Sequence, residues 1–266
     1  MYIETHSHLN NKAFDSDRAV VIGRVFKTGV GKIIEIACGA KEWRPAEELC
    51  GEYKGEIAAA FGIHPHYTDD LTPENLKTLS DYLKKDICSG IGEIGLDYYW
   101  DNAKKEAQLK LLEAQLELSN ASGRICVFHA RNGKDPKADN SYLDLALELK
   151  KKWTLNNKKR ARGVLHCFAG SWEDAKAGMD LGMFLGVNGT FTYKKNDALR
   201  ETVKKIGLRN IVLETDCPYL PVQKMRGKRN DPSFIPEIGL AVAEFLGVRA
   251  EELAEATTIN ASELFL

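Results

Sequence analysis

The stretch YIETHSHL, residues 2–9, is the first strand-like run of the chain, and it argues against a common kind of α/β fold. A doubly wound open sheet usually carries a glycine-rich nucleotide fingerprint directly after its first strand. No such fingerprint follows residues 2–9, and the chain contains no Walker A loop. The run ends instead with His6 and His8, which point to the same side of a strand because they are two residues apart.

Similar short runs alternate with stretches of helical periodicity along the whole chain. In residues 104–122, for example, apolar residues recur every three or four positions, as they do on one face of a helix. This alternation predicts parallel strands joined by helical crossovers, and eight such units close into an α/β fold of the (β/α)8 TIM barrel type. The eight runs are residues 2–6, 32–38, 57–64, 89–97, 125–130, 162–168, 184–190 and 210–216.

Length and composition agree with this fold. The chain has 266 residues, of which 44% are hydrophobic and 28% charged, so we expect one globular domain over residues 1–266. No apolar run reaches the ~18 residues of a membrane span, and no signal segment opens the chain. The six cysteines are scattered without a CxxC pair, which predicts buried thiols in a reducing compartment. We therefore expect a cytoplasmic enzyme with no membrane contact and no obligate protein partner.

The charge distribution limits how the protein can bind phosphates. The net charge of −1 does not indicate a general electrostatic attraction to nucleic acid, so any phosphate binding must come from local clusters of cations. Residues 150–163 form a charged, poorly periodic connection, which we expect to be a solvated excursion before the sixth strand.

All six histidines fall at or just beyond the C-terminal end of a predicted strand. In a TIM barrel this face carries the active site. Imidazole and carboxylate donors suit Zn, Mn, Co, Ni or Fe(II) in a catalytic site, whereas a structural zinc site uses thiolates. The histidines are His6, His8, His64, His66, His129 and His166, and the carboxylates that end the fourth and eighth strands are Glu93, Asp97, Glu214 and Asp216.

These donors are too many for one metal ion, which needs three or four protein ligands. Two ions about 3.5–4 Å apart would account for the surplus, and Glu93, central in strand order, is the natural bridging carboxylate. A water between two such ions loses a proton readily and would attack as hydroxide at neutral pH. An adjacent carboxylate would accept its remaining proton and return it to the leaving group. The pattern therefore predicts a metal-dependent hydrolase.

Seven blocks of sequence, in the same order and over nearly the whole chain, resemble the TatD family of metal-dependent hydrolases, a branch of the amidohydrolase-like TIM barrel superfamily. Glu4 and Ser7 stand where this family commonly has Asp and Cys. The blocks are ETHSHL (4–9), FGIHPHY (61–67), GEIGLDYY (92–99), FHAR (128–131), LHCFAG (165–170), ETDCPYLP (214–221) and RGKRNDPSFIP (226–236).

The resemblance implies a set of metal ligands. The ions would be two divalent cations, with Zn, Mn, Mg, Co and Ni as candidates. The implied ligands are His6, His8 and Asp216 for one ion, His129 and His166 for the other, and Glu93 between them.

The resemblance also implies roles in catalysis. Asp216 would orient and deprotonate the attacking water in addition to binding metal. His64 would lie beside the metals and touch the scissile group. Arg226 would contact a substrate phosphate.

Five further features keep two interpretations each. His66 either approaches the substrate or caps a turn, and Asp97 either lines the pocket or makes a structural hydrogen bond. Glu214 either orients a metal ligand from the second shell or is a buried, paired carboxylate. Residues 98–100, Tyr-Tyr-Trp, either pack loops or stack on a nucleobase. The four cations within residues 224–229 either receive an anionic substrate or belong to a solvated loop.

Three functions compete. The first is a TatD-type deoxyribonuclease that hydrolyses phosphodiester bonds in single-stranded DNA or at DNA ends, with nucleic acid as its partner. The second applies the same chemistry to a carboxylic ester or amide, for example in an aminoacyl-tRNA or a small molecule. The third is a non-catalytic scaffold stabilised by metal, which the ligand set disfavours because structural sites are closed. We predict the deoxyribonuclease.

Overall fold

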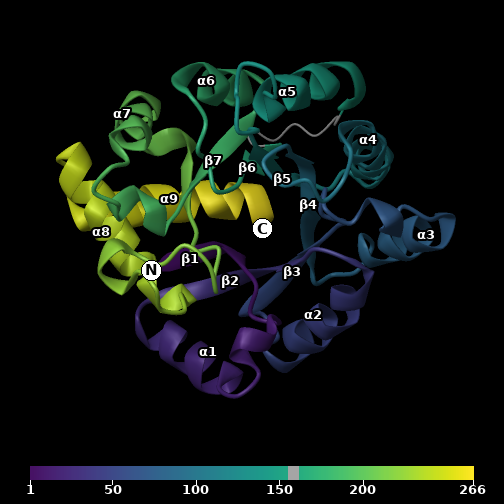
Figure 1. Ribbon diagram of the computed structural model, residues 1–266. Coiled ribbons are helices and arrows are strands. Elements are labelled where there is room, and N and C mark those ends of the chain that lie inside the picture. The colour runs from purple at the N-terminus through teal and green to yellow at the C-terminus, as the bar shows by residue number, and fades with distance from the viewer. Residues whose placement is uncertain (155–161) are drawn as a thin grey trace.

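Eight parallel strands form the centre of the molecule, and helices surround them (Figure 1). The computed structural model describes residues 1–154 and 162–266. Hydrogen bonds join the strands in the order of the sequence, and a parallel bridge between Ser7 and Cys217 brings the two ends of the sheet together, which confirms the predicted TIM barrel. The strands of the described residues are β1 (Tyr2–Ser7), β2 (Val30–Ala37), β3 (Ile57–Phe61), β4 (Cys88–Asp97), β5 (Cys126–Arg131), β6 (Gly163–Leu165), β7 (Met183–Val187) and β8 (Ile211–Leu213).

Helices connect consecutive strands along the outside of the barrel. The periodic stretch 104–122 forms α4, which ends where Gly123 adopts a left-handed backbone. The helices of the described residues are α1 (Arg18–Lys27), α2 (Ala40–Glu52), α3 (Pro73–Tyr82), α4 (Lys105–Ser122), α5 (Ser141–Lys152), α6 (Trp172–Asp180), α7 (Asp197–Ile206), α8 (Ile235–Leu246) and α9 (Ala250–Phe265).

The strands are buried on both faces, so they contribute to two apolar clusters. In β2, Ile34 and Ile36 point into the barrel while Ile33 and Ala37 pack against the surrounding helices. This alternation follows from the two-residue period of a strand, and it explains why apolar residues occur at successive positions within the strands. The inner cluster also contains residues of α9, which therefore closes the N-terminal end of the barrel and leaves the opposite end open.

Strand β4 contains three glycines in six residues. The letters GIGEIG, residues 90–95, match the spacing of a dinucleotide-binding loop, but they lie within the strand and not in a strand-to-helix turn. Gly95 has a φ of +143°, and a Cβ on it would overlap the main-chain carbonyl oxygen of His129 in β5. The glycine thus permits a close approach of the two strands that carry Glu93 and His129.

Part of the solvated excursion expected at residues 150–163 belongs instead to a helix and a strand. Residues 150–152 end α5, and Gly163 begins β6. Trp153 is buried rather than solvated, and residues 155–161 of that prediction lie outside the described residues. Among the helices that the structure describes, none combines the length and the apolar character needed to cross a bilayer.

Candidate metal centre and active site

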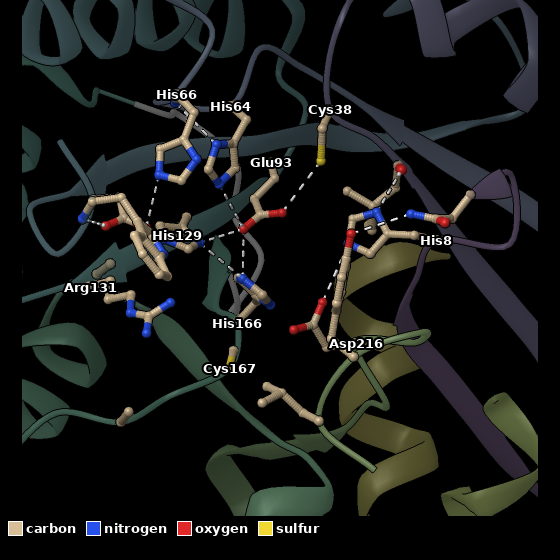
Figure 2. Close-up of a pocket in the computed structure, with 18 of the residues that line it drawn as sticks. His8, Cys38, His64, His66, Glu93, His129, Arg131, His166, Cys167 and Asp216 are labelled. Carbon is tan, nitrogen blue, oxygen red and sulfur yellow. Dashed lines mark hydrogen bonds and ion pairs between the residues drawn. The ribbon is translucent and has the colours of Figure 1, made fainter. Parts of the chain in front are cut away.

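The six predicted metal ligands converge at the C-terminal ends of five strands, and Figure 2 labels all of them except His6. All six carry imidazole or carboxylate groups, and Glu93 lies among the histidines in the middle of the group. His6 and His8 belong to β1 and the residue after it, Glu93 to β4, His129 to β5, His166 directly follows β6, and Asp216 follows β8.

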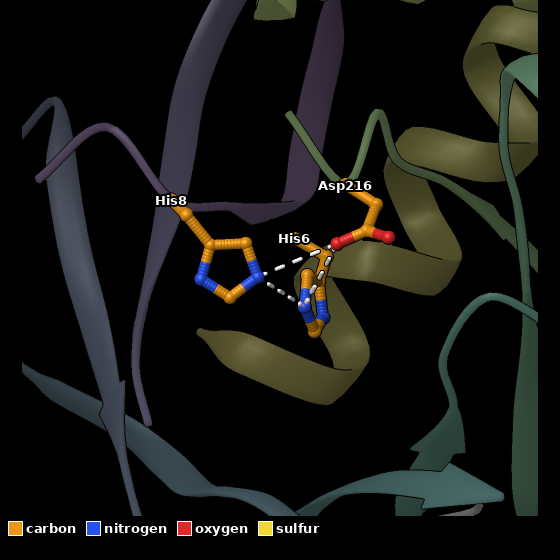
Figure 3. A group of neighbouring side chains, drawn as sticks. All are labelled: His6, His8 and Asp216. Carbon is orange, nitrogen blue, oxygen red and sulfur yellow. Dashed lines mark hydrogen bonds and ion pairs between the residues drawn. The ribbon is translucent and has the colours of Figure 1, made fainter. Parts of the chain in front are cut away.

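The first group of donors consists of His6, His8 and Asp216 (Figure 3). The Nε2 atoms of the two histidines face each other at 3.3 Å. The Oδ1 atom of Asp216 lies 3.3 Å from Nε2 of His8 and 3.8 Å from Nε2 of His6. Asp216 reaches this position from a left-handed backbone with a φ of +56°, a conformation that Asp adopts more readily than most residues.

The second group consists of His129, His166 and Glu93. The Oε1 atom of Glu93 lies 2.6 Å from Nδ1 of His129 and 2.7 Å from Nε2 of His166. Its Oε2 atom lies 3.5 Å from Nε2 of His6, in the first group. The two oxygens of one carboxylate therefore face two different sets of histidines.

The hydrogen-bond partners of His8 and His129 show where the protons of these two rings lie, and so whether a cation fits between them. Nδ1 of His8 lies 3.2 Å from the carbonyl oxygen of Ile36, which can only accept, so the proton of a neutral His8 is on Nδ1 and the lone pair on Nε2. Nε2 of His129 lies 3.0 Å from the Asp97 carboxylate, which leaves the lone pair on Nδ1. Both lone pairs are directed at the carboxylates of the centre, and a positive ion is what satisfies several acceptors that face one another. The residues fit divalent metal.

The two central carboxylates are ionised, as metal binding requires. Burial alone would raise the pKa of Glu93, but the neighbouring His166 and His129 lower this pKa well below its usual range. Burial also acts to raise the pKa of Asp216. With no ion bound, protonated His8 and His166 lower this pKa, His8 through a hydrogen bond and His166 through its charge. Negative charge is thus concentrated where the histidine nitrogens converge.

The carboxylates of Asp97 and Glu214 lie next to two of the proposed ligands, His129 and His166, respectively. Oδ2 of Asp97 lies 3.0 Å from Nε2 of His129 and 3.1 Å from Nε2 of His66. Asp97 also lines the cavity, so both interpretations of this residue agree with the geometry. Oε1 of Glu214 accepts a hydrogen bond from the backbone of Cys167 and lies 3.7 Å from Nδ1 of His166. Carboxylates in such positions fix the orientation of the imidazoles in front of them.

His64 presents a proton to the centre. Its Nδ1 accepts a hydrogen bond from the backbone N–H of His66, so the ring proton lies on Nε2, 3.7 Å from Oε1 of Glu93. Burial lowers the pKa of His64 to about 3, and the imidazole is therefore neutral at physiological pH. A neutral donor directed into the site suits contact with an oxygen of the substrate.

A cavity of about 1120 Å³ opens over these groups. Its wall includes the exposed aromatic residues Tyr67, Trp100 and Tyr219 and the cations Lys12 and Arg131. Such a cavity is large enough for several groups of a substrate to enter together.

Comparisons with known proteins agree on one family. A family model described as TatD related DNase matches residues 3–266. The metal-dependent hydrolase YabD of Bacillus subtilis, described as uncharacterized, is 32% identical over 265 residues, which are 100% of this chain and 99% of that protein. The 3'-5' ssDNA/RNA exonuclease TatD of Pantoea ananatis is 30% identical over 263 residues, 97% of this chain and 96% of that protein. The chain belongs to the TatD family of metal-dependent hydrolases.

A solved structure of the TatD family supports the same conclusion. The crystal structure of YJJV, a TatD homolog from Escherichia coli K12, matches with a TM-score of 0.89 and 30% identity, covering 99% of this chain and 97% of that chain. The prediction of a metal-dependent TIM barrel hydrolase is thus confirmed.

Arg226 lies at the edge of the TatD-type cavity and does not line it. Its guanidinium carbon lies 4.9 Å from the ring centroid of Tyr193, which does line the cavity. Two of its cationic neighbours are paired with carboxylates, Lys224 with Glu237 and Arg229 with Asp17, and this weakens the interpretation of residues 224–229 as an anion-binding cluster.

The structure adds two residues that sequence reasoning did not place in the site. Arg131 lines the cavity, and its position two residues after His129 in the same strand was a signal for this. Sγ of Cys38 lies 3.4 Å from Oε2 of Glu93, and Cys38 forms a possible ligand group with His8 and Glu93. Cys38 is therefore a possible further donor beside the six predicted ligands.

Proposed function

We propose that this TatD-family protein is a divalent-metal-dependent nuclease that hydrolyses phosphodiester bonds in single-stranded nucleic acid, DNA above all, or at its ends. One observation carries the proposal: the two oxygens of Glu93 face two separate groups of donors at the floor of an open cavity. This is the arrangement that a pair of metal ions needs for clamping the attacking and leaving oxygens of a phosphate.

The proposed ligand set divides between two ions. Its support is the close approach of the donor atoms within each group and the direction of their lone pairs. His6, His8 and Asp216 would hold one ion, His129 and His166 would hold the other, and Glu93 would contribute to both sites.

Three residues of the chain and the bound ions would each have a distinct role in hydrolysis. Bound ions would supply Lewis acidity, which lowers the pKa of a water and neutralises charge on a phosphoryl oxygen. Asp216, whose side chain is 13% exposed toward solvent, accepts the proton of the attacking water and can return it to the leaving oxygen. His64 donates a hydrogen bond from Nε2 to the scissile group. Arg226 contacts a phosphate farther along the substrate, from the edge of the cavity.

The substrate class draws on the relatives and on the cavity. The Pantoea ananatis relative is named as an exonuclease of single-stranded DNA and RNA. The cavity of this chain places Lys12 and Arg131 beside exposed aromatic rings, and single strands are bound by the same combination of cations and aromatic side chains.

A substrate screen tests the proposal directly. The protein is loaded with Zn, Mn, Mg, Co or Ni in turn and incubated with end-labelled single-stranded DNA, duplex DNA, RNA and an aminoacyl-tRNA. We expect metal-dependent shortening of the single strands, abolished by a chelator. Release of the amino acid without any cleavage of the strands would replace this proposal with an ester or amide hydrolase, and no metal-dependent turnover would leave a scaffold.

A further inference from the structure

Two aromatic residues directly after β4 are exposed to solvent beside the metal centre. Tyr99 is 38% exposed and Trp100 is 51% exposed, and Trp100 lines the cavity. Their neighbour Tyr98 behaves differently, because its ring packs against the hydrophobic core and its hydroxyl donates to Asp144. Burial in the core thus explains Tyr98, whereas the indole of Trp100 lies at the surface, where its ring centroid is 5.0 Å from that of Tyr99.

The Asp97 carboxylate fixes Trp100 close to the metal ligands. Oδ1 of Asp97 accepts hydrogen bonds from the backbone N–H groups of Tyr99 at 2.9 Å and Trp100 at 3.3 Å. The other oxygen, Oδ2, lies 3.0 Å from Nε2 of His129. One carboxylate therefore holds both the loop that carries the indole and a proposed metal ligand.

An arginine without a carboxylate partner completes this part of the wall. The guanidinium carbon of Arg131 lies 4.2 Å from the ring centroid of Tyr99 and 5.6 Å from that of Trp100. Among the residues that the structure describes, Arg131 makes no ion pair with a carboxylate, although its side chain is exposed and lines the cavity. Figure 2 shows its guanidinium on the same side of the centre as His129.

We propose that Trp100 stacks on a nucleobase of the substrate strand next to the scissile phosphate, while Arg131 binds the backbone of that nucleotide. The inference rests on the proposed nuclease function and adds a residue that selects the substrate. Every base has a flat π face, so stacking on an indole tolerates any sequence. A base inside a duplex is stacked and paired on both sides, and it must be freed before it can reach Trp100. The subsite therefore favours single strands and frayed ends over duplex DNA.

Paired oligonucleotides separate stacking from phosphate binding. The metal-loaded protein is titrated with a short single strand of hydrolysis-resistant phosphorothioate linkages, and with the same strand in which all bases are removed. We expect Trp100→Leu to weaken binding of the base-containing strand by roughly 5- to 150-fold, the range for one stacked base, and to leave binding of the abasic strand unchanged. Trp100→Phe retains a ring and should restore most of the affinity.

Two controls show whether the effect is local. Phe245→Leu removes another exposed aromatic ring, on α8, from a residue that does not line the cavity, and should change neither affinity. Arg131→Gln should weaken binding of both strands and flatten the log–log salt dependence by roughly 0.7 per lost phosphate contact. The base-containing strand should quench the tryptophan fluorescence of the wild type, and this quenching should largely disappear in Trp100→Phe. The measurement therefore tests stacking with a conservative substitution that does not destabilise the protein.

The outcomes distinguish this inference from the function on which it rests. If the wild-type protein binds the base-containing strand and Trp100→Leu binds it equally well, the stacking role is refuted while the nuclease proposal stands. Equal losses of affinity for the two strands would also refute stacking, because they would show a general effect on the cavity. If the wild-type protein binds neither strand, the nuclease proposal itself fails and the subsite fails with it.

Discussion

Asp216 is both a proposed metal ligand and the proposed proton acceptor, and one substitution tests the second role. Asp216→Asn keeps the size of the side chain, but an amide cannot accept the proton of an attacking water and is a weaker ligand. We expect kcat to fall by about 10²- to 10⁴-fold while the circular dichroism spectrum remains that of the wild type. Asp86→Asn is a matched control, since Asp86 is exposed just before β4, at the other end of the barrel. Near-wild-type turnover of Asp216→Asn at saturating metal would remove Asp216 from the base role.

Individual residues of the site differ in how well the sequence could predict them. Histidines at strand ends could be predicted to converge, because parallel strands of a barrel end on one face. Cys38 ends an apolar run, so it has the pattern of a core thiol. Only the folded barrel shows that it reaches Glu93 across the end of β3, which lies between β2 and β4. Arg226 follows Asp216 closely in the sequence, but its guanidinium lies over Tyr193. Its side-chain direction depends on the loop conformation, which local pattern does not encode.

At the scale of elements, the contact between β4 and β5 sets the distance between Glu93 and His129. Gly95→Ala would place a Cβ against the carbonyl oxygen of His129 and force a side chain onto a φ of +143°. We expect a loss of stability of more than about 3 kcal/mol, together with reduced metal content, because both strands must shift. Urea unfolding and metal analysis by mass spectrometry measure the two effects. Gly23→Ala is the control: nothing lies within 4 Å of its new Cβ in α1, so it should stabilise by about 0.5–1 kcal/mol.

The same elements show what periodicity can and cannot predict. The eight strand runs and the helix at 104–122 could be read from apolar patterns, because each pattern reports which face of its own segment is buried. The role of α9 could not be predicted in this way, because an apolar face does not indicate which surface the helix packs against. Only the folded chain shows that α9 packs into the N-terminal end of the barrel and so leaves the metal centre as the accessible end.

At the scale of the whole molecule, buried thiols make stability fall at alkaline pH. Burial raises the pKa of Cys50 and Cys126 to about 12 and that of Cys88 to about 11, above the ordinary value of 9.0. Above pH 9 the unfolded chain loses these protons while the folded chain keeps them, so stability decreases as pH rises toward 11–12. Each thiol contributes up to about 1.4 kcal/mol per pH unit, and Cys50→Ala should make the slope shallower by that amount. Urea unfolding from pH 8 to 11 measures it, and identical slopes would contradict the assignment.

Metal binding should also stabilise the whole barrel, because the proposed ligands come from five strands. An ion that binds only the folded chain stabilises it by about 2.7 kcal/mol when its free concentration is a hundred times its Kd. Removing the ions with a chelator should therefore lower Tm by roughly 5–10 °C, and adding metal back should restore it.

Glu93→Ala tests whether the loss of stability on metal removal depends on the proposed bridging carboxylate. Without the bridge, at least one ion should be lost, so the variant should contain less metal and its Tm should respond to the chelator less than that of the wild type. Glu56→Ala, an exposed change before β3, should keep the full response. If Glu93→Ala keeps both ions and the full shift in Tm, Glu93 is not the bridge. The two groups of histidines would then have to hold their ions independently.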